Sequence, residues 1–317
     1  MFKIEPEIKS LRNAYGSALV DLGGKNQNIV VLDADLSSST QTCQFQKAYP
    51  ERFFNVGISE QDLMGTGAGL AREGKIVYVS TFAVFATGRC LDQIRNAICY
   101  QKLNVNIVAT HGGLTVGEDG ASHQALEDIA LMRSLPNMTV IVPSDATEVY
   151  QAVKYVSQIE GPSYIRIPRT NLKTIFDEEK YIFNPKKAVT IKEGSDASVI
   201  TNGETLQEVI GAYELLKKDG IKIEILHMPA MKPFYDYETI INSAKKTKLV
   251  ITVENHSIIG GLGSEICEIL SEKCPTQVIR LGVKDTFGQS GEQSVLMDYY
   301  GLNKQRLYEQ IKNILGK

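Results

Sequence analysis

Short apolar runs that alternate with helix-like patterns constrain the fold of this chain most strongly. In the first half the runs cover residues 29–32, 76–79, 105–109, 140–142 and 164–167, and helical spacing fills the intervals. Runs without polar alternation are typical of parallel strands that are buried on both faces. Strand and helix in alternation predict a doubly wound α/β domain with right-handed crossovers.

The second half shows the same alternation on a smaller scale. A polar stretch, residues 170–187, separates the halves and is typical of a linker. We therefore expect two doubly wound α/β domains with mainly parallel sheets, over residues 1–180 and 190–317. The expected strands of the second domain are residues 197–201, 221–226, 249–253 and 278–281, and its expected helices are residues 204–217, 263–271 and 304–315. A further helix is predicted at the start of the chain, from Glu7 to about Leu22.

Composition excludes several classes of partner. The 317 residues are 43% hydrophobic, enough for two domains with proper cores. A net charge of -3 without blocks of like charge gives no footprint for nucleic acid or an anionic membrane. The N-terminus is too polar for a signal peptide, and no apolar run has the length of a membrane span. A cytoplasmic protein is expected.

Polar side chains follow most of the predicted strands of the first domain. In doubly wound sheets ligands bind at the carboxyl ends of the strands, where these side chains would meet. The pattern therefore predicts a binding site at this edge of the sheet. The residues are Asp33, Asp35, Ser80, Thr81, His111, Ser144, Asp145 and Arg169.

A carboxylate, Glu60, stands where an apolar extended segment turns into a helix. Ser59 is a good N-cap, and acids at 60 and 62 suit the positive end of the helix dipole. Glycines at 65, 67 and 69 follow as if another backbone or a ligand approaches closely. Ordinary helix capping would explain the same residues, so the neighbouring motifs decide between structure and chemistry.

Two further stretches supply those motifs. Residues 77–86 contain Thr81-Phe82-Ala83-Val84-Phe85, and residues 110–124 read Thr-His-Gly-Gly-Leu-Thr-Val-Gly-Glu-Asp-Gly-Ala-Ser-His-Gln. With these stretches and Glu60, the chain resembles the transketolases. The likeness covers nearly all of the chain, and it matches only the C-terminal half of a full-length transketolase, namely the pyrimidine-binding and C-terminal domains.

The resemblance implies roles at a thiamine diphosphate site. Glu60 would be catalytic and would bind the cofactor by touching N1′ of its aminopyrimidine, while Phe82 and Phe85 would pack against the ring. An apolar enclosure formed by these two rings would favour the neutral form of the carboxyl group. Transketolases usually carry a tyrosine where this chain has Gly88, so one aromatic contact is expected to be missing or supplied elsewhere.

The resemblance also implies a sugar site. Asp119 would bind the hydroxyl next to the reacting carbon, and His123 would bind and polarise donor hydroxyls as a second catalytic residue. His111 would lie further out beside a substrate phosphate, which Arg12 and Arg169 would grip. A guanidinium binds phosphate in bidentate fashion. The expected reaction is transfer of a two-carbon ketol unit from a ketose or ketose phosphate to an aldose or aldose phosphate.

A second position and one motif also depart from the family pattern. Asp33 aligns with a serine that helps to hold the phosphate, and an acid there would repel it. The Gly-Asp-Gly motif that binds Mg²⁺ and the diphosphate is absent, since Glu118-Asp119-Gly120 does not match it. We therefore expect no metal ligand in this chain. An N-terminal, diphosphate-binding transketolase subunit would hold Mg²⁺ and the diphosphate, in an α2β2 assembly.

Three alternatives stay open. A 1-deoxyxylulose-5-phosphate synthase-like chain or a 2-oxo acid dehydrogenase β subunit would share the fold and the glutamate, although His111 favours sugar transfer. A nucleotide-binding regulatory module could use Gly65-x-Gly67-x-Gly69 or Gly260-Gly261-x-Gly263, which is weak evidence. A catalytically silent relative is disfavoured because both Glu60 and the histidine loop are present.

Overall fold

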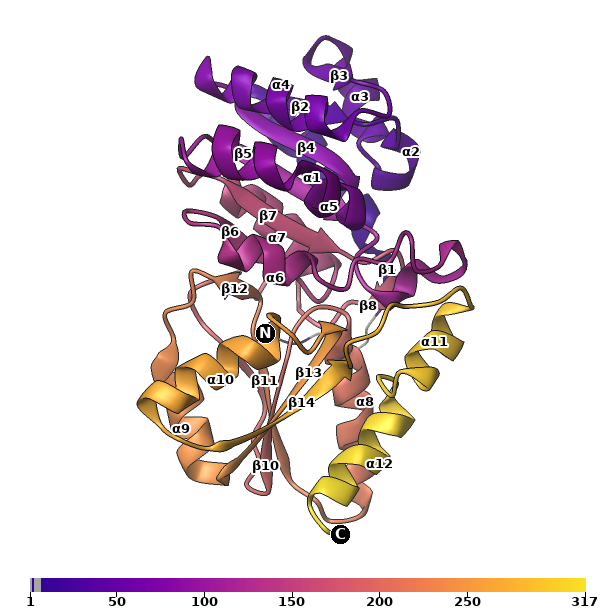
Figure 1. Cartoon of the computed structure of the whole chain (residues 1–317), viewed down its shortest axis with the longest axis vertical. Coiled ribbons are helices and arrows are strands. Elements are labelled where there is room, and N and C mark those ends of the chain that lie inside the picture. The colour runs from indigo at the N-terminus through magenta and orange to yellow at the C-terminus, as the bar shows by residue number, and fades with distance from the viewer. Residues whose placement is uncertain (1, 3–6) are drawn as a thin grey trace.

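Two main sheets, stacked one above the other in Figure 1, organise the chain. The computed structural model describes residue 2 and residues 7–317. The upper sheet has the strand order β12-β6-β7-β5-β4-β2-β3, parallel except for β12. Its strands are β2 (Ile29–Asp33), β3 (Phe53–Asn55), β4 (Ile76–Phe82), β5 (Val105–Thr110), β6 (Thr139–Ile141), β7 (Ser163–Ile167) and β12 (Ala230–Lys232).

The lower sheet has the order β14-β13-β10-β11-β9, in which only β9 is antiparallel. Its strands are β9 (Val189–Lys192), β10 (Ala197–Thr201), β11 (Ile223–His227), β13 (Leu249–Ser257) and β14 (Gln277–Val283). The prediction of a mainly parallel α/β fold is therefore confirmed, and every strand predicted from an apolar run is present with ends shifted by a few residues at most.

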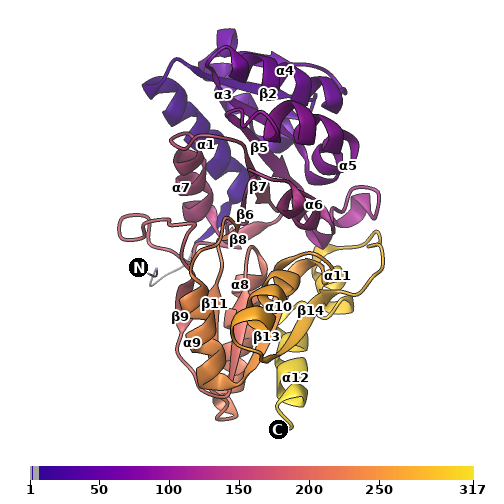
Figure 2. The same cartoon turned by 60° about the vertical axis from the view of Figure 1, so that its left-hand side comes forward.

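Helices cover both faces of the upper sheet. Figure 2 shows α1 and α7 on one face and α4, α5 and α6 on the other, and two separate groups of buried apolar side chains fill the two interfaces. The upper helices and helical turns are α1 (Leu11–Lys25), α2 (Ser37–Thr40), α3 (Cys43–Ala48), η1 (Pro50–Arg52), α4 (Glu60–Arg72), α5 (Ala83–Gln93), the π-helical η2 (Ile94–Cys99), the 3₁₀ turn η3 (Leu114–Asp119), α6 (Asp128–Ser134) and α7 (Ala146–Val156). The lower helices are α8 (Thr205–Lys218), α9 (Tyr237–Thr247), α10 (Leu262–Lys273), α11 (Gln293–Tyr299) and α12 (Lys304–Ile314).

The first helix begins later than predicted. Residues Ile8–Ser10 form strand β1, which pairs antiparallel with β8 (Asn171–Lys173), and the Ser10 hydroxyl accepts a hydrogen bond from the Asn13 amide to start α1. The expected start at Glu7 was wrong because this strand pairing competes with the helical pattern. The linker prediction was also incomplete, since that segment holds β8 and buries Phe176 and Tyr181.

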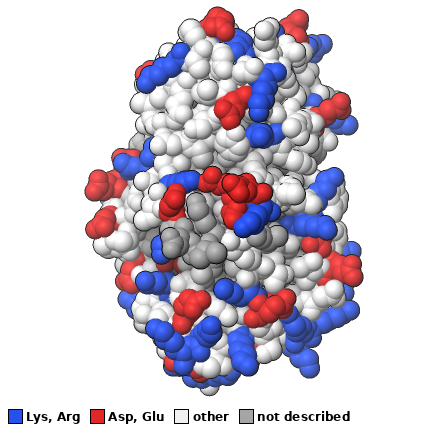
Figure 3. Space-filling model, turned by 180° about the vertical axis from the view of Figure 1, so that it is seen from behind, with Lys and Arg blue, Asp and Glu red and all other residues white. Residues whose placement is uncertain are grey.

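No helix within residues 7–317 is both long and apolar enough to cross a bilayer. Basic and acidic side chains are interspersed over the face shown in Figure 3, in keeping with the small net charge.

Candidate active site

Glu60 begins helix α4 beside the end of the short edge strand β3. The loop between them turns at Gly57, whose φ is 75° and whose amide donates to the side chain of Asn55. Ser59 stands at the N-cap position, but its hydroxyl makes no capping hydrogen bond, so the predicted side-chain cap was wrong. The carboxylate of Glu60 is buried, and its Oε1 accepts a hydrogen bond of 2.7 Å from Arg89 Nη1 of helix α5.

The two predicted aromatic residues lie together at the end of β4. The ring centres of Phe82 and Phe85 are 5.8 Å apart. The guanidinium carbon of Arg89 lies 4.0 Å from the centre of the Phe85 ring, so one arginine bridges the carboxylate and the aromatic wall. An apolar enclosure of Glu60 was expected, but the enclosure is partly ionic.

Both predicted loop histidines join this aromatic group. Phe82 stacks on His111 with 3.8 Å between ring centres, and Phe85 meets His123 edge to face at 5.2 Å. Burial and the nearby charges of Arg12, Arg169 and His123 lower the pKa of His111 to about 3. A neutral imidazole at ordinary pH can donate one hydrogen bond and accept another, which suits a group that binds sugar hydroxyls or phosphate.

The two predicted phosphate-binding arginines come from opposite ends of the first domain's sequence. Arg12 of α1 donates to the carbonyl of Ser39 at 2.9 Å, and burial together with the charge of Arg169 lowers its pKa. Arg169, which follows β7, donates to the carbonyl of Val116 at 2.6 Å and pairs with Asp119 at 3.4 Å. Arg169 thus contacts the loop that carries the histidines, and the charges of both arginines act on His111.

Asp33 has a structural role. Its buried carboxylate accepts hydrogen bonds from the Leu36 amide at 2.6 Å, Thr40 Oγ1 at 2.7 Å and Thr42 Oγ1 at 2.9 Å. These donors hold the loop that follows β2. The three donors compensate the burial of this carboxylate. The expected repulsion of phosphate by this acid stays a prediction.

The residues fit the pyrimidine half of thiamine diphosphate. Beside Glu60 and the phenylalanines, the buried Thr81 hydroxyl has no hydrogen-bond partner, and a side chain added at Gly88 would meet open space. No cluster of three or more His, Cys, Asp or Glu side chains suited to a metal ion occurs in the part of the chain that the structure describes.

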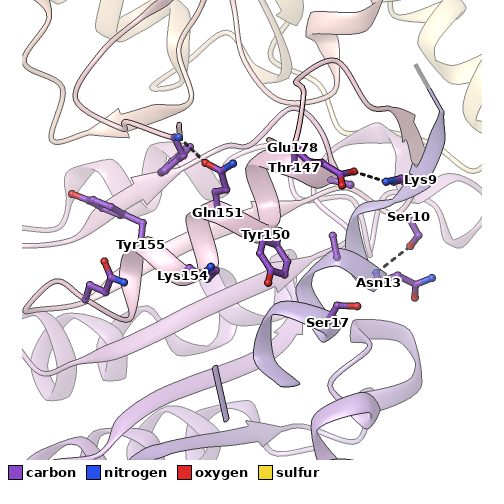
Figure 4. Close-up of a pocket in the computed structure, with 14 residues that line it drawn as sticks. Lys9, Ser10, Asn13, Ser17, Thr147, Tyr150, Gln151, Lys154, Tyr155 and Glu178 are labelled. Carbon is purple, nitrogen blue, oxygen red and sulfur yellow. Dashed lines mark hydrogen bonds and ion pairs between the residues drawn. The ribbon is translucent and has the colours of Figure 1, made fainter. Parts of the chain in front are cut away.

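A large surface pocket lies elsewhere. It has a volume of about 1030 Å³ and lies between α1 and α7, where Figure 4 shows Asn13, Ser17, Tyr150 and Lys154 around it. None of the predicted site residues lines it. The pocket and the predicted cofactor site are therefore separate parts of the domain.

The glycine-rich turn before α10 does not offer a phosphate site. The carboxylate of Glu254 accepts hydrogen bonds from the amides of Leu262 at 2.7 Å and Gly263 at 2.9 Å. It thereby takes the place at the helix N-terminus that a nucleotide phosphate would need. The other glycines, at 65, 67 and 69, lie inside α4 and not between a strand and a helix. Neither run supports the nucleotide-binding alternative.

Sequence reasoning missed Arg89, although its spacing from Phe85, four residues along a helix, could have identified it. It also missed Arg166, Glu204 and Asn255, which are buried where the two domains meet. Arg166 Nε pairs with Asp128 at 2.9 Å, and its Nη2 donates to the carbonyl of Asn255 at 2.9 Å. No local sequence signal marks these contacts, since they join segments far apart in the chain.

Comparison with known families agrees with this geometry. Residues 8–174 match the pyrimidine binding domain of transketolase, and residues 186–307 match the transketolase C-terminal domain. These two matches place the chain in a thiamine diphosphate-dependent class of enzymes.

Individual relatives of the chain are transketolases or parts of them. The chain is 46% identical to a Methanocaldococcus jannaschii protein described as a transketolase C-terminal section, over all of both chains. It is 37% identical to a 6-deoxy-6-sulfo-D-fructose transketolase subunit of Clostridium, covering 96% of this chain and 94% of that one. A split-gene transketolase solved as an inactive β4 tetramer superimposes with a TM-score of 0.89 at 48% identity, covering 97% of this chain and 98% of the other. The chain belongs to the transketolase family and corresponds to its C-terminal section.

Some relatives are about twice as long as the region that this chain matches. Mouse transketolase is 35% identical over 100% of this chain, which covers 50% of the mouse protein. The chain therefore corresponds to about half of a single-chain transketolase.

Proposed function

We propose that this chain is the C-terminal subunit of a split transketolase, active with a separate diphosphate-binding subunit in an α2β2 assembly. One observation carries the proposal: Glu60, Phe82 and Phe85 lie together in this chain as a candidate pyrimidine site, whereas its sequence lacks the Gly-Asp-Gly motif with which the family holds Mg²⁺ and the diphosphate. Two relatives support it, because they are named as subunits of transketolases, one for 6-deoxy-6-sulfo-D-fructose and one for apulose 4-phosphate.

In the proposed reaction a two-carbon ketol unit passes from a ketose phosphate to an aldose phosphate. Thiamine diphosphate supplies, when bound with Mg²⁺, a nucleophilic carbon that also serves as an electron sink. Glu60 would hold the aminopyrimidine, and Phe82 and Phe85 would pack against it. A role in the pentose phosphate pathway and a cytoplasmic location remain predictions.

The remaining predicted residues would act on the sugars. His123 and Asp119 would bind donor hydroxyls, and His111, neutral through burial, would bind further along the substrate. Arg12 and Arg169 would bind the terminal phosphate by charge-assisted hydrogen bonds. The named relatives are transketolases, which favours this reaction over the pyruvate-using alternatives.

Reconstitution tests the proposal. The chain is mixed with the product of the neighbouring reading frame, thiamine diphosphate and Mg²⁺, and two-carbon transfer from xylulose 5-phosphate to ribose 5-phosphate is followed. Transfer by the mixture and by neither chain alone is expected. Pyruvate turnover without sugar transfer would instead support the 1-deoxyxylulose-5-phosphate synthase-like or 2-oxo acid dehydrogenase alternative.

Loss of the Arg169 guanidinium should weaken binding of phosphorylated sugars. In the reconstituted enzyme, we expect Arg169→Ala to raise KM for a phosphorylated donor by about 10- to 100-fold, since a hydrogen bond to a charged group is worth about 1.5–3 kcal/mol. KM for an unphosphorylated donor should change much less. The matched control is Arg306→Ala, which removes an exposed arginine of α12 that pairs with Asp298. Equal losses for both donors would argue against a phosphate contact.

A further inference from the structure

The loop that carries the histidines and Asp119 contains several residues with a positive φ. His111 has a φ of 61°, and Gly113, Gly117 and Gly120 have φ values of 82°, 83° and 74°. A left-handed backbone is uncommon for a residue other than glycine, and such conformations persist where neighbouring structure holds them. Other parts of the chain must therefore define the shape of residues 111–120.

The C-terminal domain provides part of that support through two buried side chains. Asn255, in β13, accepts a hydrogen bond from the Leu114 amide at 3.0 Å through its Oδ1 and donates to Glu204 through its Nδ2. Glu204, which precedes α8, accepts a second hydrogen bond of 3.0 Å from the Thr115 hydroxyl. Asn255 and Glu204 are only 3% and 4% exposed, so water cannot readily replace these contacts.

Close packing reinforces the hydrogen bonds. A Cβ atom added at Gly113 would lie 2.5 Å from Nδ2 of Asn255, and one added at Gly112 would lie 2.6 Å from Nε of Arg166. The two glycines thus let the loop backbone sit directly on the side chains that join the domains. A larger residue at either position would push the loop away.

A second segment of the C-terminal domain contacts the far side of the loop. The Ser290 hydroxyl donates to the carbonyl of Glu118 at 2.5 Å, and Gln124 Nε2 donates to the carbonyl of Gln289 at 3.0 Å. The residues flanking Asp119 are therefore held from both sides by the same domain.

We infer that the C-terminal domain fixes the geometry of the sugar-binding loop, with Asn255 and Glu204 as positioning residues for His111 and Asp119. The inference rests on the proposed function for its link to sugar binding, and on the contacts alone for its link to the loop. Neither residue is hydrogen-bonded to Glu60, and both reach the aromatic pair only through the loop, so their loss should affect sugar binding far more than cofactor binding.

Two variants test the inference. Asn255→Ala removes the acceptor for the Leu114 amide, and Thr115→Val removes the hydroxyl bond to Glu204 with little change of shape. Asn202→Ala is the matched control, because Asn202 is a buried asparagine of the same domain whose side-chain amide contacts the sulfur of Met231 and not the loop. Thr115→Ser, which keeps a hydroxyl, should restore normal behaviour.

Hydrogen exchange and kinetics give separate readouts. In the full chain, amides of residues 112–118 should exchange at least about tenfold faster in both test variants, while those of strand β5 stay unchanged. In the reconstituted enzyme, KM for the ketose phosphate should rise at least about tenfold with an unchanged Kd for thiamine diphosphate. Asn202→Ala should change neither quantity.

The two readouts separate the inference from the proposed function. Unchanged exchange in both test variants would overturn the positioning role, and so would faster exchange with an unchanged KM. If the wild-type mixture transfers no two-carbon unit, the proposed function fails, and the exchange result alone then decides whether the C-terminal domain positions the loop.

Discussion

Replacement of Glu60 by Gln should lower two-carbon transfer by the reconstituted enzyme about 10²- to 10⁴-fold, the range expected for a lost acid–base group. Glu60 is buried at the start of α4, beside Phe85 and within hydrogen-bonding distance of Arg89. Gln keeps the size of the side chain and an acceptor oxygen for Arg89, but it cannot exchange a proton with the aminopyrimidine. The fold should therefore survive while catalysis is lost.

Asp62→Asn is the matched control for this prediction. Asp62 is an exposed acid in the first turn of the same helix, and its carboxylate accepts only a 3.3 Å hydrogen bond from Thr66 among the described contacts. Its replacement should leave turnover within about twofold of wild type, since surface changes of this kind shift free energies by less than about 0.5 kcal/mol. Near-normal turnover of Glu60→Gln would show that Glu60 is not a catalytic residue.

Arg166→Met should destabilise the chain by about 3–5 kcal/mol, the cost of leaving one member of a buried ion pair alone. Asp128 is fully buried, and Arg166 and the Tyr164 hydroxyl both donate to its Oδ2, at 2.9 Å and 2.6 Å. Arg166 also donates to the carbonyls of Ala125 and Asn255. The substitution would therefore leave a buried carboxylate and two buried carbonyls with fewer partners, although methionine fills most of the volume.

Unfolding in denaturant measures this effect as a shift in the denaturant concentration at the midpoint of the transition. The dependence of the unfolding free energy on denaturant concentration should stay the same if only stability has changed. Arg306→Met is the control, because the pair of Arg306 with Asp298 is about half exposed on both sides. It should cost less than about 1 kcal/mol. A loss below about 1 kcal/mol for Arg166→Met as well would show that the buried pair contributes little to stability.

The strands of both main sheets could be predicted because most of them are buried on both faces and so appear as continuous apolar runs. Other elements had no such signal. Strand β12 is three residues long and exists because it pairs with β6, almost ninety residues earlier in the sequence. Strand β1 likewise depends on β8. Short strands formed by non-local pairing cannot be recognised from a local pattern, because their stability comes from the partner strand.

In the candidate site, too, the residues in local motifs could be predicted and the long-range contacts could not. Glu60, the aromatic pair and the histidine loop stand in local motifs, and the structure places all of them at one edge of the upper sheet. The hydrogen bonds of Asp33 could not be predicted, because its partners lie on a loop whose course the sequence does not reveal. Asn255 and Glu204 were missed because their contacts cross from one domain to the other.

Cofactor binding tests the central claim most directly. Thiamine diphosphate with Mg²⁺ is titrated by calorimetry into this chain, into the diphosphate-binding subunit, and into the mixture of the two. Tight binding is expected for the mixture only, because in the proposed assembly this chain would supply the pyrimidine site and its partner the diphosphate site. Tight binding by this chain alone would contradict a split cofactor site.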